Sequence, residues 1–171
     1  MSTDSWQCSS CGYRLQGPAL EDLDPVAYHE AGHILMRWLL LPETLGDTCI
    51  HPDGSGYSAT SRPGELIQTE EAILLTLAGP VAEVGMLGGT IDIEQSHSED
   101  IASVLAWLTP DYLHGWPGGR YTQREAFDYY WERARKELYH AFDALESLAW
   151  HLTLSSILTA DEIRAICGQS S

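Results

Sequence analysis

Hydrophobic residues recur at spacings of three and four in several stretches of the chain, the pattern of helices with one buried face. The first stretch follows Asp24-Pro25, where an N-capping residue precedes a proline suited to the first helical position. Apolar residues continue through Leu41, and Pro42 ends the predicted helix.

Two more helices are predicted in the middle of the chain. Residues 65–86 are almost wholly apolar at their centre, and Gly79-Pro80 should kink or divide the helix, because proline removes a helix hydrogen bond. Ser96-His-Ser-Glu99 has the form of a capping box and predicts the start of a helix that runs to about residue 108. Asp100 would lie in the first turn of this helix.

The C-terminal third is also predicted to be helical. A loop rich in Gly, Pro and Trp is expected over residues 109–119. Apolar residues between Phe127 and Leu152 keep spacings of three and four, which predicts one long amphipathic helix. Thr159-Ala-Asp-Glu162 is a second capping box and should open a short last helix.

Short β-like pieces interrupt this helical pattern at residues 48–50 and 56–60, which predicts a hairpin or two edge strands. The expected fold is therefore mainly α (α+β), with a small β element beside the first helix. The 171 residues suit one domain. We expect that domain to span residues 24–171, after a polar N-terminal tail of residues 1–23.

The composition excludes several classes of function. The net charge is −16, from 25 acidic and 9 basic residues, so the surface should repel nucleic acid and anionic lipid. The longest apolar run, residues 34–41, is broken by Arg37 and is far shorter than the roughly 20 residues that cross a bilayer. No secretory signal is visible in the first 25 residues. We expect a cytoplasmic protein without a membrane segment or nucleic-acid partner.

The tail contains Cys8-Ser-Ser-Cys11, the spacing of one half of a zinc knuckle. A site with four cysteine ligands needs a second pair, and the isolated Cys49 and Cys167 do not supply one by spacing. Either these thiols have no structural role, or the half-site is completed by another chain.

The first helix contains His29-Glu-Ala-Gly-His33, an H-E-x-x-H motif. Residues four apart share one helix face, so both imidazoles can bind one Zn²⁺ at about 2.0–2.1 Å. Glu30, a further ~100° round the helix, can instead take a proton from a zinc-bound water and pass it to the leaving amine. The alternative is an ordinary buried helix, but unpaired imidazoles among apolar flanks are costly. Gly32, a poor helix former, also requires a packing or access reason.

A catalytic zinc needs three protein ligands and one open position, so the third ligand must come from elsewhere. The cluster at residues 97–100 is favoured, because free N–H groups and the dipole at a helix start hold a carboxylate in place. Spacing alone does not choose among its members. The candidates along the chain are Glu83, Asp92, Glu94, His97, Glu99 and Asp100.

Four blocks, in the same order, resemble the peptidase domain of the FtsH-type ATP-dependent zinc metalloproteases. The blocks are Tyr28-His-Glu-Ala-Gly-His33, residues 47–60 with Ile50, Pro52 and Gly56-Tyr57, Leu77-Ala-Gly-Pro-Val-Ala-Glu83, and Ser98-Glu-Asp-Ile101. Residues 144–163 are similar to that family's C-terminal helices, so the resemblance covers residues 25–166. It implies a zincin-like helical peptidase domain with an edge strand beside the zinc-binding helix.

The resemblance also implies roles for individual residues. The zinc ligands would be His29, His33 and Asp100, with Glu30 as general base and Glu83 as a carboxylate that orients a ligand imidazole. A polypeptide substrate would bind as an added strand. The edge strand that receives it would contain Gly56, Tyr57, Ser58 and Ala59. The other interpretation of this segment is a small hairpin that shields the core.

Three departures from the family affect the expected function. Only 24 residues precede the zinc-binding helix and no P-loop occurs, so activity is expected to be independent of ATP. Pro80 stands where the family usually has arginine. The Trp-rich segment 107–118 has no clear counterpart and could cover the cleft.

The main hypothesis is a stand-alone zinc-dependent endopeptidase that cleaves unstructured or partly unfolded polypeptide segments. The alternative is a metal-bound or metal-free adaptor or regulatory domain that retains the peptidase fold. Hydrolysis of a non-peptide amide would use the same residues. A homo-oligomer or a separate partner protein is compatible with each.

Overall fold

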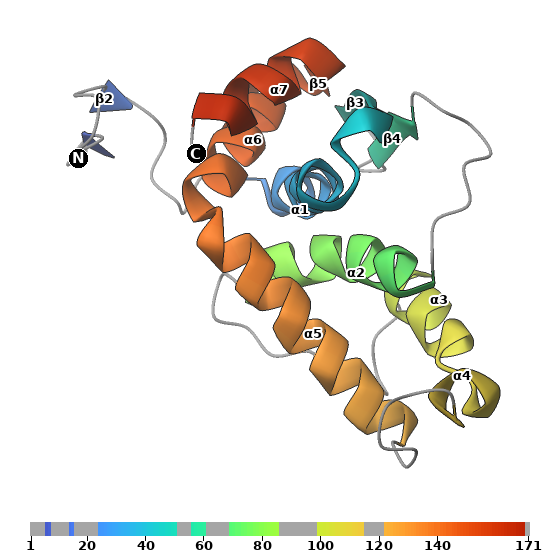
Figure 1. Ribbon diagram of the computed structural model, residues 1–171. Helices are drawn as coiled ribbons and strands as arrows, with labels where there is room; N and C mark the ends of the chain where they lie inside the picture. Colours follow the sequence, from blue (N-terminus) through green and yellow to red (C-terminus); the bar gives the residue numbers. More distant parts are fainter. Residues whose placement is uncertain are drawn as a thin grey trace.

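The computed structural model describes residues 6–7, 14–15, 24–50, 56–60, 69–85, 99–114 and 122–169 (Figure 1). The described part of the chain is mainly α, as the hydrophobic pattern predicts. The helices are α1 (Pro25–Leu40), α2 (Thr69–Pro80), α3 (Glu99–Trp107), α4 (Pro110–His114), α5 (Gln123–His140), α6 (Phe142–Ser155) and α7 (Ala160–Gln169). The strands are β1 (Trp6–Gln7), β2 (Arg14–Leu15), β3 (Leu45–Ile50), β4 (Gly56–Thr60) and β5 (Ile157–Leu158). A 3₁₀ turn, η2 (Pro42–Thr44), and a π-helical turn, η3 (Val81–Gly85), complete the elements.

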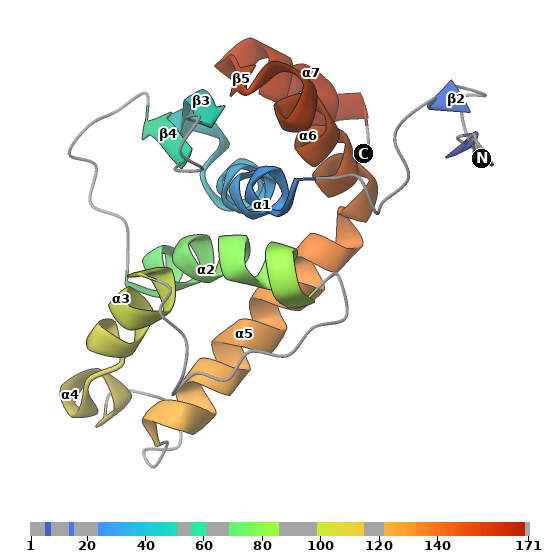
Figure 2. The same ribbon diagram turned by 180° about the vertical axis from the view of Figure 1, so that it is seen from behind.

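Helix α1 lies at the centre of the molecule, between α2 on one side and α6 on the other, as Figures 1 and 2 both show. Its start is as predicted: the Asp24 side chain accepts a hydrogen bond from the backbone N–H of Val26, and Pro25 occupies the first turn. Ala27, Ala31 and Ile34 are fully buried. Side chains from α1, α2, α3, α5, α6 and α7 share one hydrophobic core, so the central helix is held from several directions.

Gly32 allows α1 and α2 to approach closely. A Cβ at this position would lie 2.3 Å from the carbonyl oxygen of Ala78 and 2.7 Å from the Cβ of Ala82. Neither neighbour can move without shifting backbone, so no larger residue fits. From the sequence, Gly32 was expected to serve either close packing or access. The close approach of α2 confirms the packing role.

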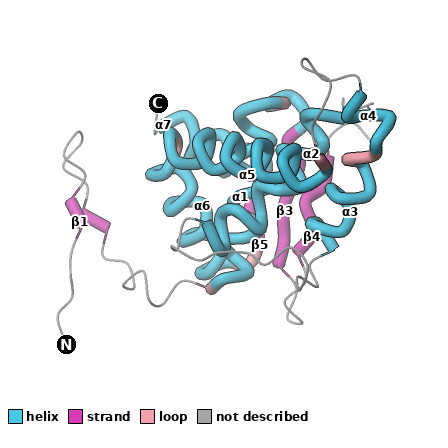
Figure 3. The backbone as a smooth tube through the Cα atoms, turned by 90° about the horizontal axis from the view of Figure 1, so that it is seen from below, coloured by secondary structure: helices cyan, strands magenta, loops and turns pink. Residues whose placement is uncertain are grey.

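The predicted hairpin is confirmed, with β3 and β4 antiparallel and Cys49 opposite Tyr57 (Figure 3). The strand β5 was not predicted; its two residues pair with the other side of β3, with Thr48 opposite Leu158. The sheet order is β4-β3-β5, which places β4 at an edge. Strand β4 also contacts α1, so an edge strand lies beside the helix that carries the H-E-x-x-H motif.

The single long helix predicted over residues 127–152 is wrong, because the chain turns at Ala141 and forms α5 and α6. The Ala141 N–H bonds to the carbonyl of Leu138, three residues back, and its backbone (φ −118°, ψ 34°) is not helical. The turn lets α5 pack against α2 while α6 packs against α1. The apolar spacing continues through the turn, from Leu138 to Leu145, so the pattern could not reveal it.

Residues 109–119 were predicted to be a loop, but they include the short helix α4. Thr109-Pro110 repeats the cap-then-proline signal of the first helix: the Tyr112 N–H bonds to the Thr109 hydroxyl at 3.3 Å. The Tyr112 hydroxyl then bonds to that of Tyr130 at 2.7 Å, which ties α4 to α5. Residues 115–119 lie outside the described part.

The capping box at Thr159 is confirmed. The Thr159 N–H donates to the Glu162 carboxylate at 2.8 Å, and the Glu162 N–H donates to the Thr159 hydroxyl at 3.3 Å. The N–H of Ala160 bonds to the Asp47 carboxylate, so α7 is fastened to β3. The capping box proposed at Ser96 falls outside the described residues, as do Cys8 and Cys11.

Candidate metal centre

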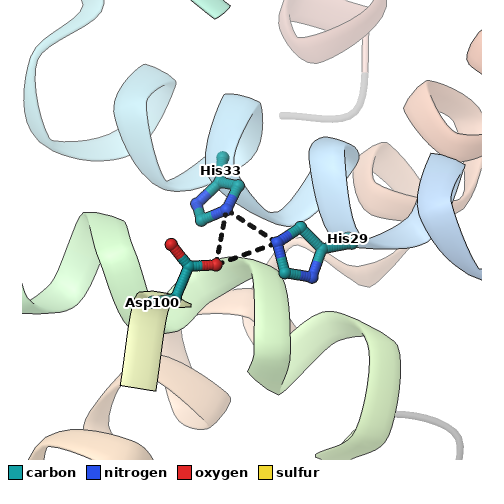
Figure 4. A group of neighbouring side chains, drawn as sticks. All are labelled: His29, His33 and Asp100. Carbon is teal, nitrogen blue, oxygen red and sulfur yellow. Dashed lines mark hydrogen bonds and ion pairs between the residues drawn. The ribbon is translucent and has the colours of Figure 1, made fainter. Parts of the chain in front are cut away.

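His29 and His33 project from the same face of α1, and Asp100 approaches them from the first turn of α3 (Figure 4). The two Nε2 atoms are 3.1 Å apart. The Asp100 Oδ2 is 3.0 Å from the Nε2 of His29 and 3.5 Å from that of His33. One ligand atom from each residue thus lies within 4.8 Å of the other two, and this group could hold a metal ion.

Each imidazole is oriented by a hydrogen bond at its other nitrogen. The Nδ1 of His33 is 2.7 Å from the carbonyl oxygen of Leu75. A carbonyl only accepts, so Nδ1 carries the proton and the Nε2 lone pair is directed at the cluster. The Nδ1 of His29 is 3.0 Å from Glu83 Oε2, which fixes the same tautomer when the carboxylate is ionised. The structure therefore brings Glu83 to the place that orients His29.

Glu83 reaches His29 from the π-helical turn that follows Pro80. The prediction that Gly79-Pro80 divides the second helix is confirmed, since α2 ends at Pro80 and η3 continues as a wider turn. Turns of this kind are rare and concentrate at functional sites. The change of helical geometry sets the direction in which the Glu83 side chain leaves the backbone.

Gly79 borders the space between the two ligand nitrogens. A Cβ at this position would lie 2.4 Å from the Nε2 of His33 and 2.6 Å from that of His29. A zinc ion would need to lie about 2.0–2.1 Å from each of these nitrogens. The glycine therefore keeps open the space that a metal ion would occupy. Both the donor atoms and the space between them fit a metal ion.

Contacts within the cluster shift the pKa values of His29 and Asp100. Burial lowers the pKa of the His29 imidazole, but its hydrogen bonds to Asp100 and Glu83 outweigh that effect, and the net pKa is raised. Burial raises the pKa of the Asp100 carboxyl, but hydrogen bonds to His29 and His33 outweigh it and the net pKa is well below its usual range. Asp100 is therefore held as a carboxylate, the form that binds a cation.

Glu30 is the remaining member of the motif and is only 8% exposed. Its charge is close enough to His29 to help raise the pKa of that imidazole. No hydrogen bond or ion pair joins the Glu30 carboxylate to another described residue. The carboxylate is therefore not engaged by another described side chain, as a general base that acts on a bound water requires.

The predicted substrate-binding residues Gly56, Tyr57, Ser58 and Ala59 all lie on β4. In the described part of the chain this strand pairs only with β3, so one of its edges has no strand partner. That arrangement is what strand addition requires. The strand order establishes that β4 lies at an edge of the sheet. Substrate binding at that edge stays a prediction.

Of the other four candidates for the third ligand, the structure describes only Glu99. Asp92, Glu94 and His97 lie outside the described residues, whereas Glu99 is exposed and does not join the cluster. Sequence reasoning missed two contributors. The Leu75 carbonyl is a backbone group with no residue-type signal, but Gly79, a helical glycine directly before a proline, was visible as an anomaly.

No protein-family model matches the chain, and no curated protein matches it. The site must therefore be interpreted from its own residues.

No helix in the described residues has the length and apolar character needed to cross a membrane. The cytoplasmic location expected from the sequence stays a prediction.

Proposed function

We propose that this protein is a zinc-dependent endopeptidase that hydrolyses peptide bonds in unstructured or partly unfolded polypeptide segments. The observation that carries the proposal is the convergence of His29, His33 and Asp100 beside the uncommitted carboxylate of Glu30. The ordered resemblance to FtsH-type peptidase domains supports it, and with it a zincin-like fold.

Zinc is the metal that best suits this donor set. Two imidazole nitrogens and one carboxylate oxygen give three protein ligands, which leaves an open position as in catalytic zinc sites. The same donors can bind non-haem iron, but the glutamate directly after the first histidine favours hydrolysis. A bound zinc ion would polarise a carbonyl group and lower the pKa of water to about 7.

Residues of the chain itself transfer the proton and orient the metal ligands. Glu30 accepts the proton of the attacking water and delivers it to the amine nitrogen that leaves. Glu83 and the Leu75 carbonyl hold the two imidazoles in position through their Nδ1 protons. Because these supports come from η3 and α2, the ligands on α1 are fixed by elements other than their own helix.

The edge of β4 supplies a general means of holding substrate. An extended segment can add to it through backbone hydrogen bonds, which tolerate many sequences. Only an unfolded or loosely folded segment can take up the extended form that pairing requires. The proposed substrate class follows from this requirement.

The test compares wild type with Glu30→Gln, which keeps the size of the side chain and removes its charge. Both proteins are assayed for bound zinc and for cleavage of casein as an unfolded substrate. We expect equal zinc content and a loss of cleavage of about 10²–10⁴-fold, the usual contribution of a general base. Zinc binding without cleavage by either protein would instead favour the adaptor function.

A further inference from the structure

Arg37 lies on the same strip of α1 as the catalytic motif. It follows Glu30 by seven residues and His33 by four, so the three side chains share one helix face. Four residues of helix correspond to about 6 Å along the axis, so Arg37 is one turn from a proposed zinc ligand. It lies at the end of α1 that leads into η2 and β3.

The guanidinium of Arg37 is half-buried, and this burial lowers its pKa. Its Nη1 donates a hydrogen bond to the Thr44 hydroxyl at 3.2 Å. Thr44 is buried, and its hydroxyl donates in turn to the Leu41 carbonyl at 2.9 Å. The arginine is therefore held in one orientation by a fixed acceptor, while a guanidinium has four other N–H groups to offer.

Arg37 differs in its pairing from the arginines on α5 and α7. On α5 and α7 every arginine pairs with a carboxylate: Arg124 with Asp128, Arg133 with Glu70, Arg135 with Glu132 and Arg164 with Asp161. These pairs are largely exposed. Arg37 is more buried and forms no ion pair with any described carboxylate, in a chain with 25 acidic residues.

A helix dipole favours a cation in the last turn, where Arg37 lies, but an exposed lysine would satisfy the dipole equally well. The half-buried guanidinium has a hydroxyl but no carboxylate partner among the described residues, and its fork of donors matches a carboxylate. The position of Arg37 and the lack of an anionic partner in the described part of the chain together indicate an anionic ligand that arrives from outside.

We propose that Arg37 binds a carboxylate of the polypeptide substrate, so that the site prefers chains with an acidic group close to the bond that is cut. This inference rests on the proposed function, since it takes the ligand to be a peptide lying along α1 and β4. The carboxylate can come from a glutamate side chain or from a free C-terminus. Because the net charge of −16 repels acidic peptides, any preference for them must arise locally.

The test measures peptide binding by fluorescence anisotropy to zinc-loaded Glu30→Gln protein, in which the peptide stays intact. Three labelled peptides share one extended sequence: one with glutamate and an amidated end, one with glutamine and an amidated end, and one with glutamine and a free C-terminus. We expect one of the two carboxylate peptides to bind about tenfold more tightly than the neutral one, as a charge-assisted hydrogen bond allows. Whichever peptide gains identifies the source of the carboxylate.

Adding Arg37→Gln should abolish this difference, whereas Arg124→Gln, which removes the same charge from an exposed ion pair, should preserve it. Thermal unfolding checks that each variant is folded, and Arg37→Lys replaces Arg37→Gln if the latter is not. Equal binding of the three peptides, no binding of any, or a preference that survives Arg37→Gln would overturn the inference.

Cleavage of the same peptides by wild type separates the two proposals. An Arg37-dependent preference in binding without any cleavage would contradict the peptidase but leave the carboxylate site standing. Cleavage of all three peptides at equal rates, with equal binding, would support the peptidase and remove the assigned role of Arg37.

Discussion

At the residue scale, Gly79 makes the simplest test of the metal site. The Cβ of an alanine would meet the Nε2 atoms of both histidines, and Leu75 and Glu83 hinder the rings from moving aside. Gly79→Ala should therefore leave a folded protein, since alanine is the better helix former, yet weaken zinc binding by at least about 100-fold. Competition with a chromophoric chelator measures the affinity.

Gly168→Ala is the matched control, because a Cβ at that position has no neighbour within 4 Å. It should bind zinc as wild type does. Wild-type affinity in Gly79→Ala would show that the metal lies elsewhere.

Asp100 and Glu83 should differ in how strongly they affect zinc binding. Asp100 offers its oxygen to the two Nε2 atoms, whereas Glu83 contacts only an Nδ1. Asp100→Ala should therefore remove most bound zinc, and Glu83→Ala should weaken binding by about 10–100-fold, the usual effect of losing a group that orients a ligand. Metal analysis after gel filtration measures both. The reverse order would make Glu83 the third ligand.

Zinc affinity should fall with decreasing pH. Zinc must displace the proton that the raised pKa of His29 favours in the metal-free protein. Below that folded-state pKa a proton competes with zinc, so affinity should begin to fall above pH ~6.5, the pKa of an ordinary histidine. Calorimetry in buffers of different ionisation enthalpy should detect proton release at pH 7. Affinity that is constant down to pH 6 would contradict this account.

His29 and Asp100 also make the stability of the metal-free protein depend on pH, and their two effects have opposite signs. The raised pKa of His29 stabilises the fold below about pH 6.5, and this contribution is lost as the pH rises through the folded-state pKa. The lowered pKa of Asp100 stabilises the fold above about pH 4, and this contribution is lost as the pH falls. Both contributions to the stability of the fold are therefore present between about pH 4 and pH 6.5.

At the element scale, the crossing of α1 and α2 positions the site. Gly32 and Ala78 bring the two helices into close contact, and Gly79 is the next residue of α2, under the histidines. Gly32→Ala would force a methyl group against the Ala78 carbonyl, so we expect destabilisation of about 1–3 kcal/mol despite the better helix propensity of alanine. Urea unfolding measures this free energy. Unchanged or higher stability would contradict the close crossing.

Element boundaries show what the hydrophobic pattern could and could not predict. The start of α1 was predictable because Asp24 and Pro25 act locally, through one cap and one fixed dihedral angle. The turn at Ala141 was not, because it is imposed by two different packing partners and leaves the apolar spacing intact. The short strand β5 was also hidden, since two residues carry no periodicity and its pairing with β3 is long-range.

At the scale of the whole molecule, the site is assembled from segments far apart in the sequence. His29 and His33 could be paired from spacing alone, because one helix holds both. Asp100 could only be narrowed to a cluster of residues by helix-start electrostatics, and its selection came from the family resemblance. The tertiary arrangement of α1 and α3 then places its carboxylate against both imidazoles.

The central claim is that one zinc ion at this site makes the protein a peptidase. The most direct test adds zinc in steps to metal-free wild type and measures the initial rate of casein cleavage. We predict that the rate rises from background and stops increasing at one equivalent of zinc per chain. Cleavage that is already maximal without zinc, or full zinc binding without cleavage, would contradict the account.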